Sequence, residues 1–90
     1  MATSSAADFA VTGEWQNVLL TLPALIGVDG MMQDKIESAP LYVCFDGAQP
    51  TDATAGARMA LAEREYFNCA TALWVRTDAA RGGKIALWSL

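Results

Sequence analysis

The sequence predicts an all-β fold: a small antiparallel β-sandwich or barrel. Short apolar or alternating stretches recur at the spacing typical of such folds. Residues that favour turns (Gly, Pro, Asp and Ser) separate these stretches. The length of 90 residues suits one domain with a modest hydrophobic core. We therefore expect a single β domain over residues 8–90, preceded by an N-terminal arm.

Residues 1–7 are rich in Ala and Ser, and we expect them to form a flexible arm. From Asp8 the pattern has a period of two, with Phe9 and Val11 on one face of a first strand. A turn at residues 12–14 follows. Residues 15–22 mix aromatic, β-branched and other apolar side chains, and they predict a second strand that ends at Pro23.

Residues 31–36 alternate and predict a strand whose one face carries Met32, Asp34 and Ile36. After a turn at 37–40, residues 41–45 are apolar on both faces. Such a strand is either central in its sheet or covered by a neighbouring chain. Asp46 and Gly47 close this strand, and Gly, Pro, Thr and Asp then indicate a loop at 48–57.

Residues 58–67 allow two interpretations. The stretch up to Glu65 contains good helix formers and, on propensity alone, favours one or two helical turns. The surrounding short strands, together with Tyr66 and Phe67, favour strand instead. We adopt a strand at 58–62, a tight turn at 63–65 and a further strand from 66.

Two strands are predicted at the C-terminal end, over residues 71–77 and 84–90, with a hairpin loop at 78–83. A hairpin would pair these strands directly. Trp74 and Trp88 would then lie on neighbouring strands, where they could share a face.

The charge and composition point to protein contacts. The net charge is −4, and the six basic residues are scattered, so we expect no nucleic-acid binding. Counting Gly in place of Tyr, about 59% of the residues are apolar, against roughly 45–50% in typical soluble domains. Seventeen of these are Ala, which bury little. Some apolar surface should still remain uncovered, and such patches usually mark interfaces.

No leader peptide or membrane span is expected. Residues 1–10 lack a basic start and a continuous apolar core. The longest uncharged apolar run, residues 18–28, is too short for a span and is interrupted by Pro23 and Gly27. We expect an aqueous, cytosolic setting, in which Cys44 and Cys69 behave as small buried hydrophobic residues. A disulfide between them is the less favoured alternative.

The sequence lacks the usual catalytic equipment, and we expect no enzyme, no metal site and no cofactor. It contains no His, no GxxxxGK[ST] loop and no GxGxxG motif. Glu63 and Glu65 are more simply explained as a solvated turn than as a catalytic pair. The acids Asp29, Asp34 and Asp46 do not follow the order of ligands in an EF-hand loop.

The aromatic residues are the best candidates for binding. Three Trp are many for a small protein, and indoles are enriched at interfaces. If Trp74 and Trp88 share a face opposite the core, they form a platform for a protein partner or, alternatively, for a sugar. The simpler alternative is that both rings are buried in the hydrophobic core. The candidate interface residues are Trp15, Tyr42, Phe45, Trp74 and Trp88.

A series of motifs occupies residues 31–90. Residues 38–43 read SAPLYV, 47–51 read GAQPT, 73–76 read LWVR and 82–88 read GGKIALW. This order resembles that of the small β-sandwich accessory proteins encoded among the virion genes of tailed bacteriophages and prophages. In their plan Pro-Gly often stands before an acidic residue, whereas this chain has Glu63 and Arg64 before Glu65.

The resemblance implies a structural virion protein with no catalytic residues. Its role would be capsid decoration, or an accessory of the neck or tail, with location in the virion and, during assembly, in the host cytoplasm. We expect a homo-oligomer, for which a trimer is one candidate, that contacts major capsid, neck or tail proteins. The alternative from another class is a carbohydrate- or receptor-binding module built on Trp74 and Trp88.

Overall fold

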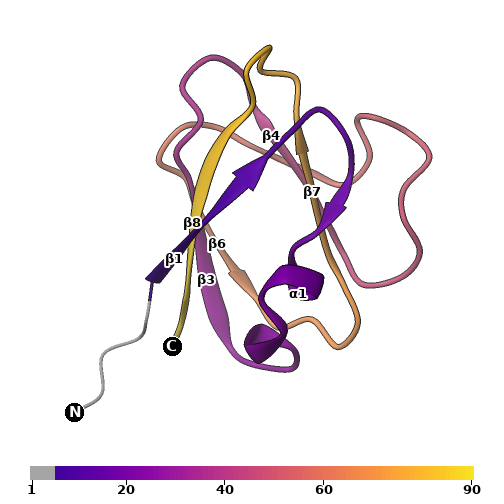
Figure 1. Cartoon of the computed structure of the whole chain (residues 1–90), viewed down its shortest axis with the longest axis vertical. Coiled ribbons are helices and arrows are strands. Elements are labelled where there is room, and N and C mark those ends of the chain that lie inside the picture. The colour runs from indigo at the N-terminus through magenta and orange to yellow at the C-terminus, as the bar shows by residue number, and fades with distance from the viewer. Residues whose placement is uncertain (1–5) are drawn as a thin grey trace.

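A computed structural model describes residues 6–90 as a sandwich of two antiparallel sheets (Figure 1). Sheet A has the strand order β1-β8-β3-β6, and sheet B has the order β2-β7-β4-β5. The predicted all-β sandwich is therefore confirmed. The strand bounds are β1 (Ala6–Val11), β2 (Gln16–Asn17), β3 (Gly30–Asp34), β4 (Leu41–Phe45), β5 (Ala57–Met59), β6 (Arg64–Phe67), β7 (Leu73–Thr77) and β8 (Gly83–Ser89).

Most of the expected N-terminal arm, residues 1–5, lies outside the described residues. Its last two residues belong to the sheet, since Ala6 pairs with Trp88 and Ala7 pairs with Leu87. The boundary at residue 7 was therefore placed two residues too late. Small Ala side chains are compatible with a strand when a neighbouring strand supplies the backbone hydrogen bonds.

The core lies between the two sheets and follows the alternation of the strands. Met32 of β3 and Ile85 and Leu87 of β8 point inward from sheet A. Leu73 and Val75 of β7 point inward from sheet B. The predicted face of residues 32, 34 and 36 is confirmed, because all three side chains are buried. The ring of Phe67 lies directly against Gly30, at a site where any Cβ would overlap its Cζ atom.

The strand predicted over 15–22 is wrong. Only Gln16 and Asn17 form a strand, and residues 18–21 form the single-turn helix α1 (Val18–Thr21). Asn17 causes the change, because its side-chain oxygen accepts hydrogen bonds from the N–H groups of Leu19 and Leu73. Pro23 then begins the 3₁₀ helix η1 (Pro23–Leu25) instead of closing a strand.

The strand interpretation of residues 58–67 is confirmed, but its boundaries are shifted toward the N-terminus by one to three residues. β5 ends at Met59, the chain turns over residues 60–63, and β6 begins at Arg64. Ala62 has φ +70° at the turn, and its N–H donates to the carbonyl of Asp34. The carboxylate of Glu63 accepts the N–H of Ala60 and closes the turn.

The hairpin predicted at 78–83 is also wrong. β7 belongs to sheet B and β8 to sheet A, so the connection crosses from one sheet to the other. Thr77 helps to direct this crossing: its N–H donates to the carbonyl of Thr12, and its hydroxyl donates to the carbonyl of Pro40. Strands adjacent in sequence lie in opposite sheets throughout residues 6–90, except for the antiparallel pair β4 and β5.

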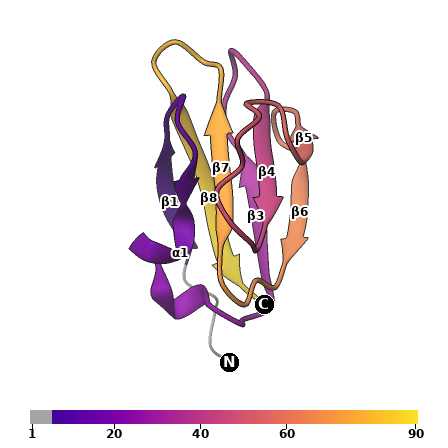
Figure 2. The same ribbon diagram turned by 90° about the vertical axis from the view of Figure 1, so that its right-hand side faces the viewer.

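Figure 2 shows sheet B from its outer side, with β7 and β4 in front of β8 and β3. The loop between β4 and β5, residues 46–56, passes across the front of this sheet. Helix α1 lies at the end of the sandwich where the C-terminus is also found.

Candidate interaction surfaces

The 46–56 loop is fixed to the outer face of sheet B by two of the predicted interface residues. The indole N–H of Trp15 donates to the carbonyl of Asp52 at 3.2 Å, and that of Trp74 donates to the carbonyl of Gly47 at 3.0 Å. Both rings are half-buried. The polar edges of these indoles therefore bind the chain's own backbone, which leaves only part of each ring for a partner.

Arg76 completes this attachment from the centre of β7. Its guanidinium donates to the carbonyls of Gly13 (3.0 Å) and Ala53 (2.6 Å) and to the carboxylate of Asp78. The guanidinium carbon also lies 5.4 Å from the centre of the Tyr42 ring, a cation–π distance. Tyr42, a predicted interface residue, is consequently buried within the chain itself.

Gly56 lets the end of this loop approach β4. Its φ is +79°, and a Cβ placed there would lie 2.1 Å from the carbonyl oxygen of Val43. Only glycine fits so close to the backbone in this conformation. At the other end of the loop, Gly47 has the same φ, but nothing lies within 4 Å of its Cβ position.

The two indoles expected to share a platform lie on opposite sides of the molecule. Trp74 is on the outer face of sheet B, next to the inward-facing Leu73 and Val75. Trp88 is on the outer face of sheet A, next to the inward-facing Leu87. The expected face-sharing was wrong because the strands belong to different sheets. Trp88 is half-buried, and the guanidinium carbon of Arg64 lies 5.8 Å from its ring centre.

Phe45 is the one predicted interface residue with a largely free side chain, 42% exposed at the end of β4. The backbone beside it is held by Asp46, whose carboxylate accepts the N–H groups of Thr71 (2.7 Å) and Ala72 (3.2 Å). These backbone hydrogen bonds lower the pKa of Asp46 below its usual value. Phe45 thus stands on a well-defined corner between β4 and β7.

The large apolar residues with the most exposed side chains were not among the predicted ones. Leu90 (68%), Leu61 (52%) and Tyr66 (50%) are exposed at separate places in the sequence. Two others share one segment: Leu20 of α1 is 80% exposed, and Ile26, just after η1, is 47% exposed. Between them, Leu22 and Leu25 pack against the core and, with Ala7 and Leu87, line a shallow apolar hollow of about 280 Å³. We call the surface formed by residues 20–26 the apolar end.

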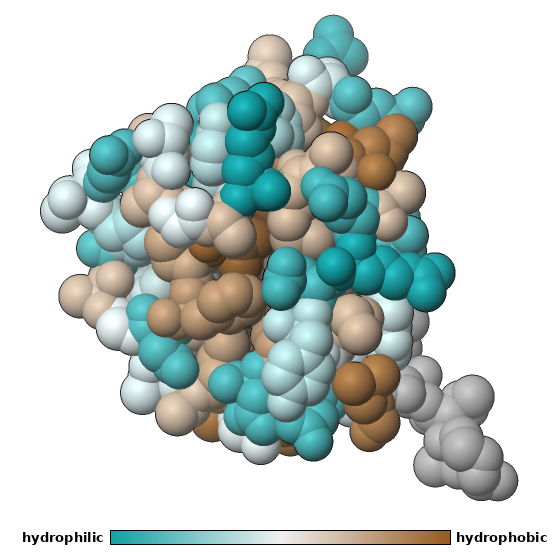
Figure 3. All heavy atoms as spheres, turned by 180° about the vertical axis from the view of Figure 1, so that it is seen from behind, coloured by the Kyte–Doolittle hydropathy of each residue, from teal (hydrophilic) through white to brown (hydrophobic). Residues whose placement is uncertain are grey.

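One sequence feature could have identified the apolar end. Residues 18–28 contain no charged side chain, and an uncharged segment of this kind is compatible with an exposed apolar surface as well as with a buried strand. Figure 3 shows the face turned away from the viewer of Figure 1, where brown atoms gather left of the centre with hydrophilic atoms around them.

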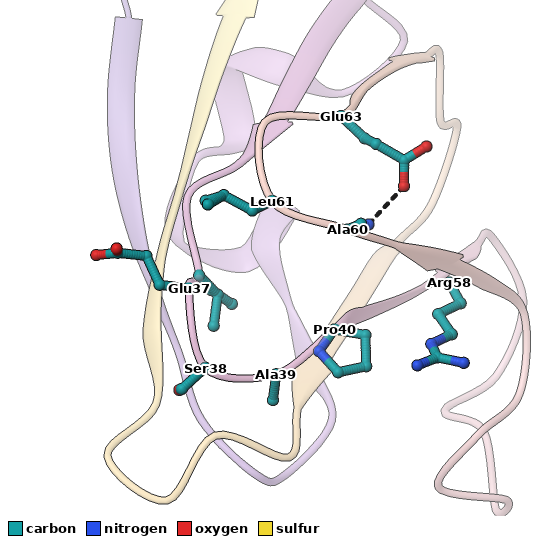
Figure 4. A pocket seen from close by; sticks show the side chains of 9 residues that line it. Glu37, Ser38, Ala39, Pro40, Arg58, Ala60, Leu61 and Glu63 are labelled. Atoms are coloured by element: carbon teal, nitrogen blue, oxygen red, sulfur yellow. Dashed lines mark hydrogen bonds between the residues drawn. The ribbon is translucent and has the colours of Figure 1, made fainter.

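A cavity of about 390 Å³ lies between the turn at residues 37–40 and the turn at 60–63 (Figure 4). Its charged lining residues are Glu37, Arg58 and Glu63. The carboxylate of Glu63 is turned toward the Ala60 N–H, with which it makes the hydrogen bond drawn in Figure 4. Glu63 is thereby a turn-closing residue. Over residues 6–90, no group of three or more His, Cys, Asp or Glu side chains is placed to hold a metal ion.

Asp34 is a buried acid next to this turn. One carboxylate oxygen accepts the N–H of Ile36 at 2.7 Å, and the other has no hydrogen-bond partner among the described residues. Burial raises the pKa of Asp34, the hydrogen bond from Ile36 opposes this effect, and the negative charge of Glu63 adds to it. An unpartnered buried oxygen destabilises the folded state, most strongly when the group is ionised.

Both cysteines are free thiols. Cys69 is buried, and burial raises the pKa of its thiol to about 11. Cys44 is half-buried, and burial raises its pKa as well. Such thiols are poor nucleophiles at neutral pH. Their placement agrees with the prediction that they act as small hydrophobic residues.

No helix within residues 6–90 has the length and apolar character needed to cross a membrane. Comparisons with protein-family models, with curated proteins and with solved structures found no match to this chain.

Proposed function

We propose that this chain is a structural virion protein of a tailed phage, a homo-oligomeric capsid decoration protein or neck or tail accessory. It stabilises the particle through protein–protein contacts and catalyses no reaction. The virion assignment rests on the resemblance of residues 31–90 to small accessory β-sandwiches. The mode of action, docking through apolar surface, rests on the apolar end.

The single observation that carries the proposal is the exposure of Leu20 and Ile26. Two large aliphatic side chains remain in water although they belong to an uncharged segment in which Val18, Leu19, Leu22 and Leu25 pack in or against the core. Burying a Leu side chain against a partner contributes roughly 1.5–3 kcal/mol.

The proposed partner is a larger virion protein with an apolar groove. The outer face of sheet B is a less suitable surface, because the 46–56 loop already covers it and uses the polar edges of Trp15 and Trp74. The carbohydrate-binding alternative depended on a joint platform of Trp74 and Trp88. That platform is not formed, and no observation favours the alternative.

The test uses Leu20→Ser, with Leu61→Ser as the matched control. Leu61 is 52% exposed and lies in the turn after β5, away from the apolar end. Wild-type and Leu61→Ser proteins should co-sediment with purified capsids, or with purified neck or tail assemblies, that lack the protein. Leu20→Ser should bind at least tenfold more weakly to the same particles.

Two results would count against this function. If the wild-type chain is a monomer that binds none of these particles, the virion assignment fails. If Leu20→Ser binds as tightly as the wild type, a different surface carries the docking.

A further inference from the structure

Strand β1 has an open edge. It is the outermost strand of sheet A and pairs with β8 on one side only. Among residues 6–90, no backbone hydrogen bond from another element reaches its other side between Ala6 and Val11. An edge strand of six residues exposes a row of N–H and C=O groups that fit another extended strand.

The other sheet edges are short or protected. β2 has two residues and β5 has three. β6 carries two charges, and its Glu65 lies opposite the inward-facing Met32, so a charge stands on the core side of that edge. Inward-facing charges at an edge strand prevent pairing with other chains. β1 has none of these protections, since its one charged residue, Asp8, is exposed on the outer face.

We propose that β1 pairs antiparallel with β1 of a second copy of this chain, across a two-fold axis, so that the two sheets A become one continuous sheet. The inference rests on the self-association in the proposed function and names the surface that carries it. It also predicts that the smallest oligomer is a dimer with two-fold symmetry.

The amino-acid pattern of β1 selects one register. Opposite residues must lie on the same face, so the inward Phe9 can face only inward residues of the other copy. Two such registers pair five residues each, one centred on Asp8 and one on Phe9. Centring on Asp8 would place two carboxylates directly opposite each other, which is unfavourable. Centring on Phe9 places Asp8 opposite Ala10 of the second copy.

This register also supplies a positive charge. Ala10 pairs with Lys84 on β8, so Asp8 of the second copy would be separated from Lys84 by a single Ala side chain. Lys84 is exposed and has no acidic partner within salt-bridge distance among the described residues. Within its own chain Asp8 already contacts Lys35 at 3.0 Å, and both flanking lysines would then offset its charge.

The test uses opposite charges at residue 10, namely Ala10→Asp and Ala10→Lys. In the proposed register each new side chain faces Asp8 of the other copy, twice per dimer. Ala10→Asp should weaken the dimer at least tenfold in sedimentation equilibrium, whereas Ala10→Lys should leave it unchanged or tighten it. Ala57→Asp and Ala57→Lys, at an exposed position on the edge strand β5, are the controls and should leave the dimer unchanged.

Other outcomes overturn the inference in recognisable ways. If both Ala10 variants weaken the dimer equally, residue 10 lies opposite residue 10 of the second copy, and the proposed register is wrong. If neither variant alters the oligomer while circular dichroism shows that both are folded, β1 is not the interface, and the proposed virion function stands on particle binding alone. A wild-type monomer that still binds particles also rejects the β1 pairing without rejecting the function.

Discussion

The outer face of sheet B and the apolar end differ in how their apolar side chains are covered. Over sheet B, the 46–56 loop lies on the strands, and the side chains beneath it donate hydrogen bonds to its carbonyls. At the apolar end no segment among residues 6–90 covers Leu20, which remains 80% exposed. Hydrogen bonds thus fix a covering loop in one region, while apolar side chains stay exposed to solvent in the other.

The comparison explains why aromatic content was a poor guide to the exposed apolar surface. An indole combines a large apolar ring with an N–H group that needs an acceptor when it is partly buried. A nearby loop can supply that acceptor from its backbone, as residues 47 and 52 do. Leu and Ile carry no such group, so burial alone decides where they lie. In this chain the exposed aliphatic residues identify the uncovered surface better than the tryptophans do.

The largest expected effect is at Gly56, where the covering loop depends on a residue without a side chain. Gly56→Ala should destabilise the fold by about 3 kcal/mol. The new side chain is disfavoured in the left-handed conformation of residue 56, and its Cβ would also collide with the Val43 carbonyl. Gly47→Ala is the matched control. With the same φ and open space around it, it should cost only about 1 kcal/mol. Urea unfolding of both variants measures the difference, and equal losses would show that the close approach at Gly56 does not matter.

Arg76 is the next test, since it joins the loop to β7. Arg76→Ala should destabilise the fold by about 2–3 kcal/mol, because three acceptors lose a charged donor and the Tyr42 ring loses its cation. Arg76→Lys keeps the charge without the planar fork and should recover only part of this loss. Denaturant unfolding would measure both variants. Full recovery with Lys would mean that charge alone, and not the set of directed hydrogen bonds, holds the loop.

The sequence predicted the parts of the fold that depend on local pattern. The strand at 41–45, the inward face of residues 32, 34 and 36, and the turn between β5 and β6 all follow from alternation and turn chemistry within a few residues. The pairing of β7 with β4, and of β8 with β1 and β3, does not. A short connection such as residues 78–82 can form a hairpin or cross between sheets, and contacts such as Thr77 with Pro40 decide between them.

The candidate surfaces were predictable to a smaller extent. Of the proposed interface residues, Phe45 is 42% exposed. Tyr42 is instead buried under Arg76, a contact between neighbouring strands that no local pattern reveals. Leu20 lies in a segment with the composition of a core strand. Its exposure follows from the hydrogen bonds that the Asn17 side chain accepts. They cap one turn of helix where a strand was predicted, and in this helix Leu20 points outward.

Asp34 tests the assumption that buried polar groups need hydrogen-bond partners. The buried guanidinium of Arg76 has such partners, whereas only one of the two carboxylate oxygens of Asp34 has one. Asp34→Asn should stabilise the fold by about 1 kcal/mol at neutral pH, because the amide has no charge to desolvate. Burial raises the pKa of Asp34 in the folded state above the ordinary 3.8, so folding favours the protonated acid. The cost of the ionised form is complete above the folded pKa and disappears as the pH falls toward 3.8.

The gain from Asp34→Asn should therefore shrink on acidification. Measuring the unfolding free energies of the variant and the wild type side by side isolates this dependence. It removes the opposite contributions of Asp29, Asp46 and Asp52, whose pKa values are lowered by hydrogen bonds. If the difference between the two unfolding free energies stays constant from pH 7 to about pH 4, ionisation of Asp34 does not destabilise the folded state.

The smallest expected effect on stability is at the apolar end, and it separates a docking surface from a packed one. Leu20→Ser should change the free energy of unfolding by no more than about 0.5 kcal/mol, because the side chain loses few contacts. Leu19→Ala, one residue earlier, removes a buried side chain and should cost about 3 kcal/mol. Urea unfolding of the two neighbours gives both values. A loss at Leu20 comparable to that at Leu19 would mean that Leu20 packs against its own chain in solution, and the apolar end would then be a covered surface like the outer face of sheet B.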